Sequence, residues 1–252
     1  MDQNQNQHSD DKGMSLIEHL SELRLRLTRS AYSIFFGMCL AWGISDHLFN
    51  LIRKPIQQYL PGGGLVYTGP IDKFMAHIKI AFVAGLVLSA PFWLYQLWKF
   101  ISPALYKNEK KMASGFIFFG TIQFVLGVLF SYFIVLPMAF KFLMSFGGDI
   151  DKPMITIDQY MSFFTQTAIV FGLTFEMPVV ISFLGIAGLV SQRFLKENRK
   201  YAVVGITVVS GIVAPPDALS MILLMIPLWV MYEISILIVG FFEKKKALEV
   251  ET

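Results

Sequence analysis

The feature that most constrains this chain is a series of six long, mostly apolar segments separated by charged or Pro/Gly-rich breaks. A helix needs about 20 apolar residues to cross the hydrocarbon core of a bilayer. The six segments are approximately 28–48, 74–100, 116–136, 163–189, 201–214 and 219–242. Because a spanning helix satisfies its own backbone hydrogen bonds in lipid, the sequence predicts an all-α, polytopic membrane protein with six transmembrane helices.

The composition also favours a lipid environment. Hydrophobic residues make up 55% of the chain and charged residues only 15%, whereas a soluble domain carries roughly 25% charged residues. The one cysteine, Cys39, cannot form an intramolecular disulfide, and four scattered histidines provide no ligand set for a structural zinc. We therefore expect no metal and no cofactor, and the net charge of +3 is too small to indicate a nucleic-acid partner.

The predicted spans differ in length, and three of them contain proline. Residues 201–214 would form a helix of only about 21 Å, less than the roughly 30 Å hydrocarbon core, and we expect the fifth and sixth helices to be short. Pro91, Pro178 and Pro227 lie inside spans and should kink them. Bent helices favour a curved, cup-shaped wall, although kinks that only optimise packing are an open alternative.

The distribution of basic residues predicts the orientation in the membrane. Fifteen of the 21 Lys and Arg residues fall in the N-terminal segment, the second-to-third and fourth-to-fifth connections, and the C-terminal tail. The positive-inside bias then places both termini in the cytoplasm, with the protein in the cytoplasmic (inner) membrane. We expect a disordered cytoplasmic tail at 1–13, one membrane domain at 14–242 and a charged cytoplasmic tail at 243–252.

Residues 15–27 have the pattern of an amphipathic helix that precedes the first span. Leucines recur at helical spacing on one face, and an S-x-x-E capping box begins the segment. Glu18, Glu22 and Arg26 follow each other at i, i+4 steps, so the two carboxylates project from nearly the same side. They form either an ordinary solvated face or a pair of carboxylates available to a ligand.

A second acidic candidate lies in the cytoplasmic connection at residues 99–114. Glu109 is the one acidic residue there, among four lysines. It either makes a local ion pair or, together with Glu22, holds the guanidinium groups of a partner, because arginine and carboxylate form bidentate charge-assisted hydrogen bonds.

Glu176 is the third acidic candidate, near the middle of the fourth predicted span. An ionisable group there costs about 2.5 to 3.5 kcal/mol on insertion scales, so it should face protein or a water-filled cavity. Its role is protonation, a polar contact to a partner helix, or structural support. Lys79 and Glu233 lie nearer span ends, where a long side chain can reach the interface.

Five blocks of sequence, in order along the chain, suggest a family. They are HLSELRLRL at 19–27, SAPFWLYQLWKFISPALYKNE at 89–109, FGLTFEMP at 171–178, PPD at 215–217 and YE at 232–233. Together they resemble the TatC family, the multi-spanning receptor subunit of the twin-arginine protein translocase. The resemblance runs from about His19 to Ile236, which is nearly the whole chain.

The resemblance implies a six-helix cup that binds signal peptides of folded proteins carrying a paired-arginine motif. With small single-span subunits of the TatA and TatB type, such a receptor exports its substrates using the proton-motive force. The implied partners are therefore twin-arginine signal peptides, those small subunits, membrane lipid and further copies of the chain.

Family positions map onto individual residues of this sequence. The resemblance implies that Glu22 and Glu109 contact the twin arginines, and the residues implied to shape this patch are Arg24, Phe100, Pro103 and Tyr106. Glu176 corresponds to a buried polar residue of the concave face. Pro55 matches an outer-loop position needed for activity, and Asp217 matches an outer hairpin that docks partner helices. Met221 stands where the family usually has glutamine, so the resemblance does not decide whether a partner helix finds a polar contact at this position.

Other functions predict features that can be compared with the sequence. A small-solute or ion transporter with a midplane site at Glu176 should show inverted repeats, and none is evident. An intramembrane protease needs a nucleophile and a base at depth, and no histidine lies deep in a predicted span. A structural scaffold would leave the buried Glu176 unexplained. We therefore expect a receptor and not an enzyme.

Overall fold

The computed structural model describes residues 16–60, 64–101, 110–145, 154–186, 188–213 and 218–250. The helices, in chain order, are α1 (Leu16–Trp42), α2 (Ser45–Ile52), α3 (Lys54–Gln57), α4 (Asp72–Leu88), α5 (Ala90–Ile101), α6 (Lys110–Phe130), the π-helical η3 (Ser131–Val135), α7 (Leu136–Ser145), α8 (Ile157–Phe175), α9 (Met177–Ile186), α10 (Gln192–Glu197), α11 (Arg199–Val213) and α12 (Ala218–Val250). In these ranges extended backbone pairs only at one isolated bridge, between Val66 and Thr156. The predicted all-α fold class is confirmed.

Several helices are long and apolar enough to cross a membrane. The continuous candidates are Ala113–Ser145, Ile157–Ile186 and Met221–Lys244. Two bent pairs, Leu20–Trp42 with Ser45–Gln57 and Asp72–Leu88 with Ala90–Phe100, bring the number to five when each is counted as one span. With 15 residues, α11 is shorter than these, as expected for the fifth segment. The chain is a polytopic helical protein, and the count of six spans stays a prediction.

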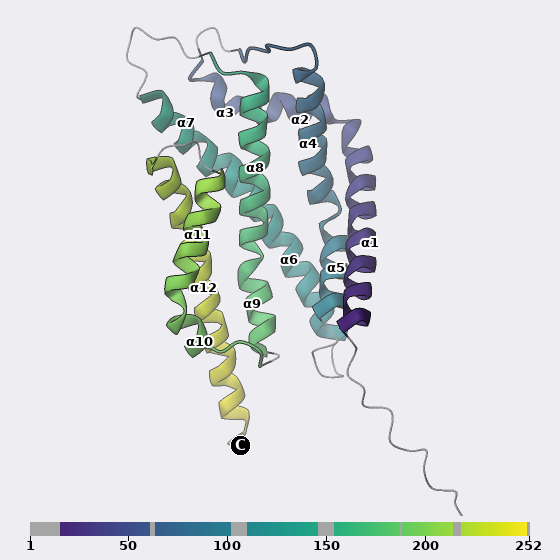
Figure 1. The fold of residues 1–252 in the computed structure, drawn as a ribbon, viewed down its shortest axis with the longest axis vertical. Coiled ribbons are helices and arrows are strands. Elements are labelled where there is room, and N and C mark those ends of the chain that lie inside the picture. Colours follow the sequence, from purple (N-terminus) through teal and green to yellow (C-terminus); the bar gives the residue numbers. More distant parts are fainter. Residues whose placement is uncertain are drawn as a thin grey trace, which may run out of the picture.

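The long helices run side by side along one axis of the molecule (Figure 1). In Figure 1, α1 and α11 lie at opposite sides of the view, and α8 with α9 runs between them. The order of packing follows this arrangement, since α1 packs on α4 and α5, α8 on α4 and α6, and α12 on α9 and α11. The start of α1 and the end of α12 lie at the same end of the molecule.

The first helix is longer than the predicted first span. The predicted amphipathic helix at 15–27 and the span at 28–48 are not separate elements, because α1 runs without a break from Leu16 to Trp42. The chain then bends by 84° before α2 and α3. The leucines and arginines around residue 27 are good helix formers, so nothing at that position interrupts the helix.

Two of the three expected proline kinks coincide with helix breaks. Ser89 separates α4 from α5, which differ in direction by 60°, and Pro91 is the second residue of α5. Pro178 is likewise the second residue of α9, after α8 ends at Phe175. Proline is tolerated there because the first turn of a helix has no intrahelical acceptor for its amide. Pro227 lies inside the uninterrupted α12.

The sixth apolar segment corrects one expectation. We expected a short sixth helix, but α12 has 33 residues, Ala218–Val250, and 24 of them form the candidate span Met221–Lys244. The helix continues past the apolar run because the following sequence, Glu243 to Val250, is rich in Glu, Lys, Ala and Leu, which have high helix propensity.

Helices α1 and α4 approach closely enough for backbone contact. A β-carbon on Gly37 would lie 2.6 Å from the carbonyl oxygen of Gly85, and one on Gly85 would lie 2.5 Å from the amide nitrogen of Met38. Only glycine fits at this crossing. Small residues at an interface are typical of helix pairs in membranes, where close packing drives association.

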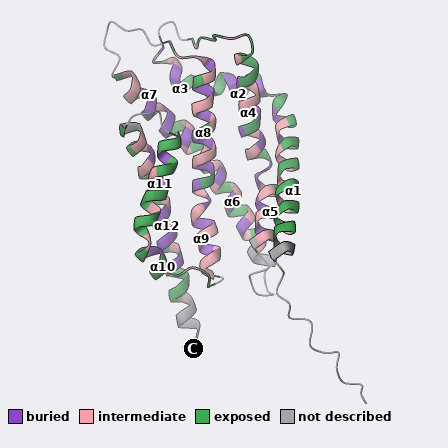
Figure 2. Cartoon of the chain, viewed as in Figure 1, coloured by how far each residue is buried: buried purple, intermediate pink, exposed green. Residues whose placement is uncertain are grey.

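Many residues on the outer faces of the helices are exposed (Figure 2), and a large share of them are large hydrophobic residues. On α1, the side chains of Tyr32, Phe35 and Phe36 are all exposed. Such a surface would be unstable in water but is stable against acyl chains.

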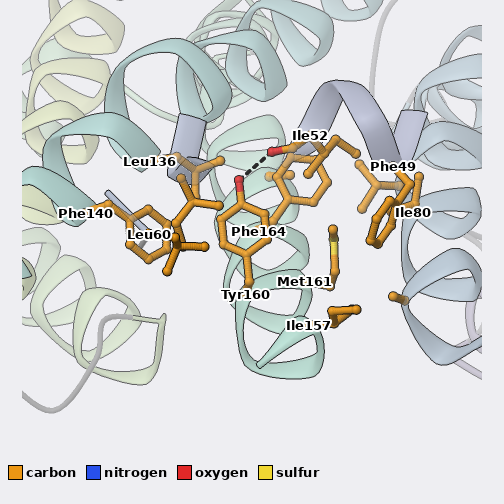
Figure 3. Close-up of a cluster of buried hydrophobic side chains, with 14 residues drawn as sticks. Phe49, Ile52, Leu60, Ile80, Leu136, Phe140, Ile157, Tyr160, Met161 and Phe164 are labelled. Atoms are coloured by element: carbon orange, nitrogen blue, oxygen red, sulfur yellow. Dashed lines mark hydrogen bonds between the residues drawn. The ribbon is translucent and has the colours of Figure 1, made fainter. Parts of the chain in front are cut away.

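The end of the molecule opposite the start of α1 and the end of α12 has its own buried core (Figure 3). Phe49, Ile52 and Ile56 of α2 and α3 pack there against residues of α4, α7 and α8. The hydroxyl of Tyr160 donates to the carbonyl of Ile52, so α8 is tied to the helices that follow α1. This packing holds the connection that contains Pro55 in a fixed place.

Candidate functional site

Glu22 lies on the side of α1 that packs on α5. Its Oε1 accepts a hydrogen bond from Nη2 of Arg26, one turn later, at 2.7 Å. Nη1 of Arg26 also donates to Oε1 of Gln96 on α5, at 3.4 Å. The Glu22 and Arg26 side chains are only 18% and 16% exposed. This pair is therefore not part of an ordinary solvated face, and its low exposure strengthens the electrostatic interaction within it.

The other residues expected at this patch divide into two groups. Arg24 is exposed and lies two residues from Glu22, about 200° around the helix, so the two side chains leave α1 in different directions. Phe100 is half-buried near the end of α5. Three further candidates lie outside the described residues, namely Pro103, Tyr106 and Glu109.

The described ends of α5 and α6 nevertheless frame the segment that contains Glu109. α5 ends at Ile101 and α6 begins at Lys110, both at the end of the molecule where α1 begins (Figure 1). Nearby on α5, Nζ of Lys99 lies 4.6 Å above the ring of Tyr95, an arrangement typical of a cation–π contact. This end of the molecule therefore combines acidic, basic and aromatic side chains.

Glu176 is a buried carboxyl group at the junction of α8 and α9. Its side chain is 4% exposed, and neither carboxylate oxygen has a hydrogen-bond partner among the described residues. Oε2 lies 3.0 Å from the position that a β-carbon on Gly120 of α6 would occupy, and Leu94 of α5 is adjacent. An unpaired carboxyl in apolar surroundings is costly, which supports a role beyond packing.

Two more buried polar atoms occur on the same pair of helices. Oε1 of Gln123 on α6 and Oγ1 of Thr165 on α8 are buried and have no hydrogen-bond partner among the described residues. Together with Glu176, these atoms give α6, α8 and the α8–α9 junction several buried acceptors without a partner among the described residues. Sequence reasoning singled out only Glu176 of this group.

Pro55 and Met221 were both expected to serve the outer side of the protein, and they belong to different elements. Pro55 is half-buried at the start of α3, and its carbonyl accepts from Nε2 of Gln58 at 3.4 Å. Met221 is half-buried in α12, and its sulfur faces Gly211 of α11. Asp217 lies outside the described residues. The structure therefore places Pro55 on α3 and Met221 on α12, each with its own local contact.

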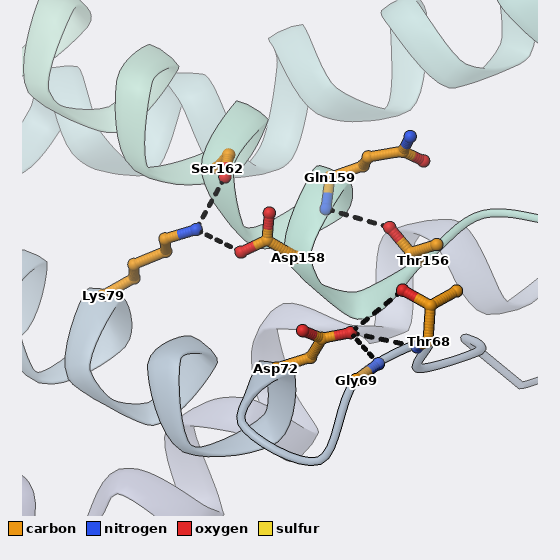
Figure 4. Close-up of polar contacts among 8 residues, drawn as sticks. All are labelled: Thr68, Gly69, Asp72, Lys79, Thr156, Asp158, Gln159 and Ser162. Atoms are coloured by element: carbon orange, nitrogen blue, oxygen red, sulfur yellow. Dashed lines mark hydrogen bonds and ion pairs between the residues drawn. The ribbon is translucent and has the colours of Figure 1, made fainter.

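An ion pair that the sequence did not predict joins α4 to α8 (Figure 4). Nζ of Lys79 contacts Oδ1 of Asp158 at 2.5 Å and donates to the hydroxyl of Ser162 at 2.7 Å. Lys79 therefore pairs with a neighbouring helix instead of only extending to the interface. Glu233 is similar, because its Oε2 accepts from Nη2 of Arg199 at 2.6 Å. The signal in the sequence was a charged residue inside one span and an opposite charge at the end of another.

The described residues offer no arrangement typical of a metal site. No group of three or more His, Cys, Asp and Glu side chains in those ranges could hold a metal ion. The chemistry available to the described site is thus that of carboxylates, guanidinium groups and buried hydrogen-bond acceptors.

Known proteins of similar sequence and structure give this geometry a context. The family model described as Sec-independent protein translocase protein (TatC) matches residues 18–227. The Sec-independent protein translocase protein TatC of Carboxydothermus hydrogenoformans is 38% identical over 238 residues, 94% of this chain and 97% of that one. The protein of the same name from Helicobacter pylori strain J99 is 40% identical over 220 residues, 87% of this chain and 86% of that one.

A solved structure agrees with the sequence comparison. The crystal structure of a twin arginine translocase receptor, TatC, is similar with a TM-score of 0.81 and 37% sequence identity, and the match covers 89% of this chain and 99% of that one. A second crystal structure of a TatC receptor, in the detergent DDM, gives a TM-score of 0.80.

Proposed function

Because the chain belongs to the TatC family of Sec-independent protein translocase proteins, we propose that it is the receptor and core subunit of a twin-arginine translocase. It binds the paired arginines of signal peptides at its cytoplasmic face. The observation that carries the proposal is the position of Glu22: a largely buried carboxylate that already binds a guanidinium group with short hydrogen-bond geometry.

The chemistry of Glu22 suits discrimination between arginine and lysine. A guanidinium group is planar and presents several N–H donors that match both oxygens of a carboxylate, whereas an ammonium group is a point charge. Glu109 supplies the second carboxylate of the proposed site, and Arg24, Phe100, Pro103 and Tyr106 form its surroundings. Two carboxylates are needed because the ligand carries two adjacent arginines.

Photo-cross-linking of a signal peptide tests this assignment. The peptide carries Arg-Arg before an apolar stretch and a photoreactive group beside the arginines. We expect Glu22→Ala and Glu109→Ala to lose cross-linking, since each lost charge-assisted contact lowers affinity roughly ten- to a hundredfold. Unchanged cross-linking in both variants would reject the proposed site.

The chain offers a matched control for these variants. Glu197 of α10 forms an i, i+4 pair with Arg193, with Nε–Oε1 distance 2.7 Å, and its side chain is 61% exposed. Glu197→Ala removes the same chemical group from a similar pair outside the proposed site. It should leave cross-linking unchanged.

The opposite end of the molecule is proposed to serve assembly. In the proposed topology both termini are cytoplasmic, so α2, α3 and the start of α8 face outward, as do Pro55 and Met221. Asp217, which lies outside the described residues, is expected to act on the same side. Small single-span subunits of the TatA and TatB type dock there, and the proton-motive force drives export. The fixed packing of α3 through Ile56, which is fully buried, supports a preformed outer surface.

Glu176 is proposed to act at membrane depth. Its two unpaired oxygens can accept hydrogen bonds from a partner helix or bind a proton during export. A small-solute transporter with a site at Glu176 is the competing function. Such a protein would bind neither the Arg-Arg peptide nor its Lys-Lys variant.

A further inference from the structure

The carboxylate proposed to bind a signal peptide is already occupied by an arginine of its own helix. Nη2 of Arg26 lies 2.7 Å from Oε1 of Glu22. The guanidinium group of Arg26 is the same chemical group as the proposed ligand. Any incoming arginine therefore meets a carboxylate that has one of its two oxygens in use.

Arg26 is held in this position from two sides. Nη1 of Arg26 donates to Oε1 of Gln96 on α5, and its Nε is buried without a hydrogen-bond partner among the described residues. Low exposure of both charged groups makes their separation costly unless another charge takes the place of the one removed. The pair is consequently stable while the site is empty and can open when a second guanidinium group arrives.

We propose that Arg26 is an internal competitor that occupies Glu22 in the empty receptor and must move aside when the arginines of a signal peptide bind. This inference rests on the proposed role of Glu22. A bidentate contact needs both carboxylate oxygens, and Arg26 holds Oε1. Gln96 keeps one hydrogen bond to Arg26 when it leaves Glu22, so the displaced side chain retains a polar partner.

The expected weakening of peptide binding follows from the fraction of receptors in which Arg26 occupies Glu22. When the binding-competent state is only a fraction of the population, the apparent Kd rises by the inverse of that fraction. If Arg26 occupies Glu22 for roughly 70 to 90% of the time, the competition weakens peptide binding about three- to tenfold. The same increase in apparent Kd applies to every ligand that must displace Arg26.

Binding of a labelled Arg-Arg peptide to the purified full chain in detergent measures the effect. Arg26→Gln should lower Kd about three- to tenfold. Arg26→Lys, which keeps the charge but loses the planar fork, should lower Kd by a smaller factor and serves as a second test if the glutamine variant fails to fold. Arg29→Gln is the control for net charge, because Arg29 is an exposed residue seven positions from Glu22, and it should change Kd less than about twofold.

The competition also predicts that the effect of changing Arg26 depends on the presence of the Glu22 carboxylate. In a Glu22→Gln background, Arg26→Gln should no longer tighten binding, because the competitor has lost its target. Equal or weaker peptide binding by both Arg26 variants in the native background overturns the inference and makes Arg26 a positioning residue. If Glu22→Gln alone leaves peptide binding unchanged, the proposed function of Glu22 fails instead, so the two failures are distinguishable.

Discussion

The carboxyl group of Glu176 on the α8–α9 junction lies directly against Gly120 of α6, a position with no side chain to fill the space. A β-carbon at position 120 would be 3.0 Å from Oε2 of Glu176 and 3.2 Å from Leu94. The buried acid therefore depends on a glycine from a helix that precedes it by more than 50 residues. The position of the carboxylate is set by packing between helices and not by α8 alone.

This contact predicts the effect of enlarging Gly120. Gly120→Val should press on both Glu176 and Leu94 and lower the free energy of unfolding by about 1 to 3 kcal/mol, as overpacked cores do. Thermal unfolding of the detergent-solubilised protein measures the change. Gly115→Val on the same helix is the matched control, since a β-carbon there contacts nothing within 4 Å. Equal losses in the two variants would contradict the packing around Glu176.

Removing the carboxyl group of Glu176 should separate stability from export. Glu176→Leu replaces an unpaired buried carboxyl with an apolar group of similar size, so we expect thermal stability to be unchanged or raised by up to about 2 kcal/mol. Export of a twin-arginine substrate in cells should fall at the same time. Loss of stability together with loss of export would instead make Glu176 a structural residue.

The ion pair between Lys79 and Asp158 predicts a modest coupling. Both side chains are partly exposed, at 29% and 49%, so we expect a coupling free energy of only about 0.2 to 1 kcal/mol. A double-mutant cycle with Lys79→Met and Asp158→Asn measures it by thermal unfolding. The coupling should shrink in high salt, and strictly additive single effects would show that the contact contributes nothing.

The crossing of α1 and α4 predicts sensitivity to a single methyl group. Gly85→Ala should separate the two helices, because its β-carbon would meet the backbone of Met38 at less than 3 Å, and we expect a loss of about 1 to 3 kcal/mol. Gly205→Ala on α11, where a β-carbon meets nothing within 4 Å, should have little effect or stabilise its helix. Thermal unfolding of both variants measures the difference. Equal stability of Gly85→Ala and Gly205→Ala would contradict the close approach of α1 and α4.

The sequence predicted the features that depend on local composition. Apolar runs and prolines can be read directly, so the helical membrane class and the breaks near Pro91 and Pro178 were predictable. The length of α12 was not predicted because apolar composition marks only the membrane-crossing part, while the helix is extended by the charged but helix-favouring residues after Phe242. Helix ends depend on backbone propensity as well as on the membrane.

Contacts between distant segments could not be predicted in the same way. The i, i+4 spacing indicated the pair of Glu22 with Arg26, but not Gln96, which is 70 residues away from Arg26. Asp158 was not predicted as the partner of Lys79 for the same reason, since it is 79 positions further along the chain. Burial of Glu22 is likewise a result of how α1 packs on α5. Spacing on one helix gives no information about which face the next helix covers.

The most direct test of the central claim compares two peptides on two proteins. Equilibrium binding of an Arg-Arg signal peptide and its Lys-Lys variant is measured with the native chain and with Glu22→Gln. The account predicts that the native chain prefers Arg-Arg by roughly ten- to a hundredfold, and that Glu22→Gln loses most of this preference. An undiminished preference in the Glu22→Gln protein would contradict the account, because the discrimination would then lie elsewhere.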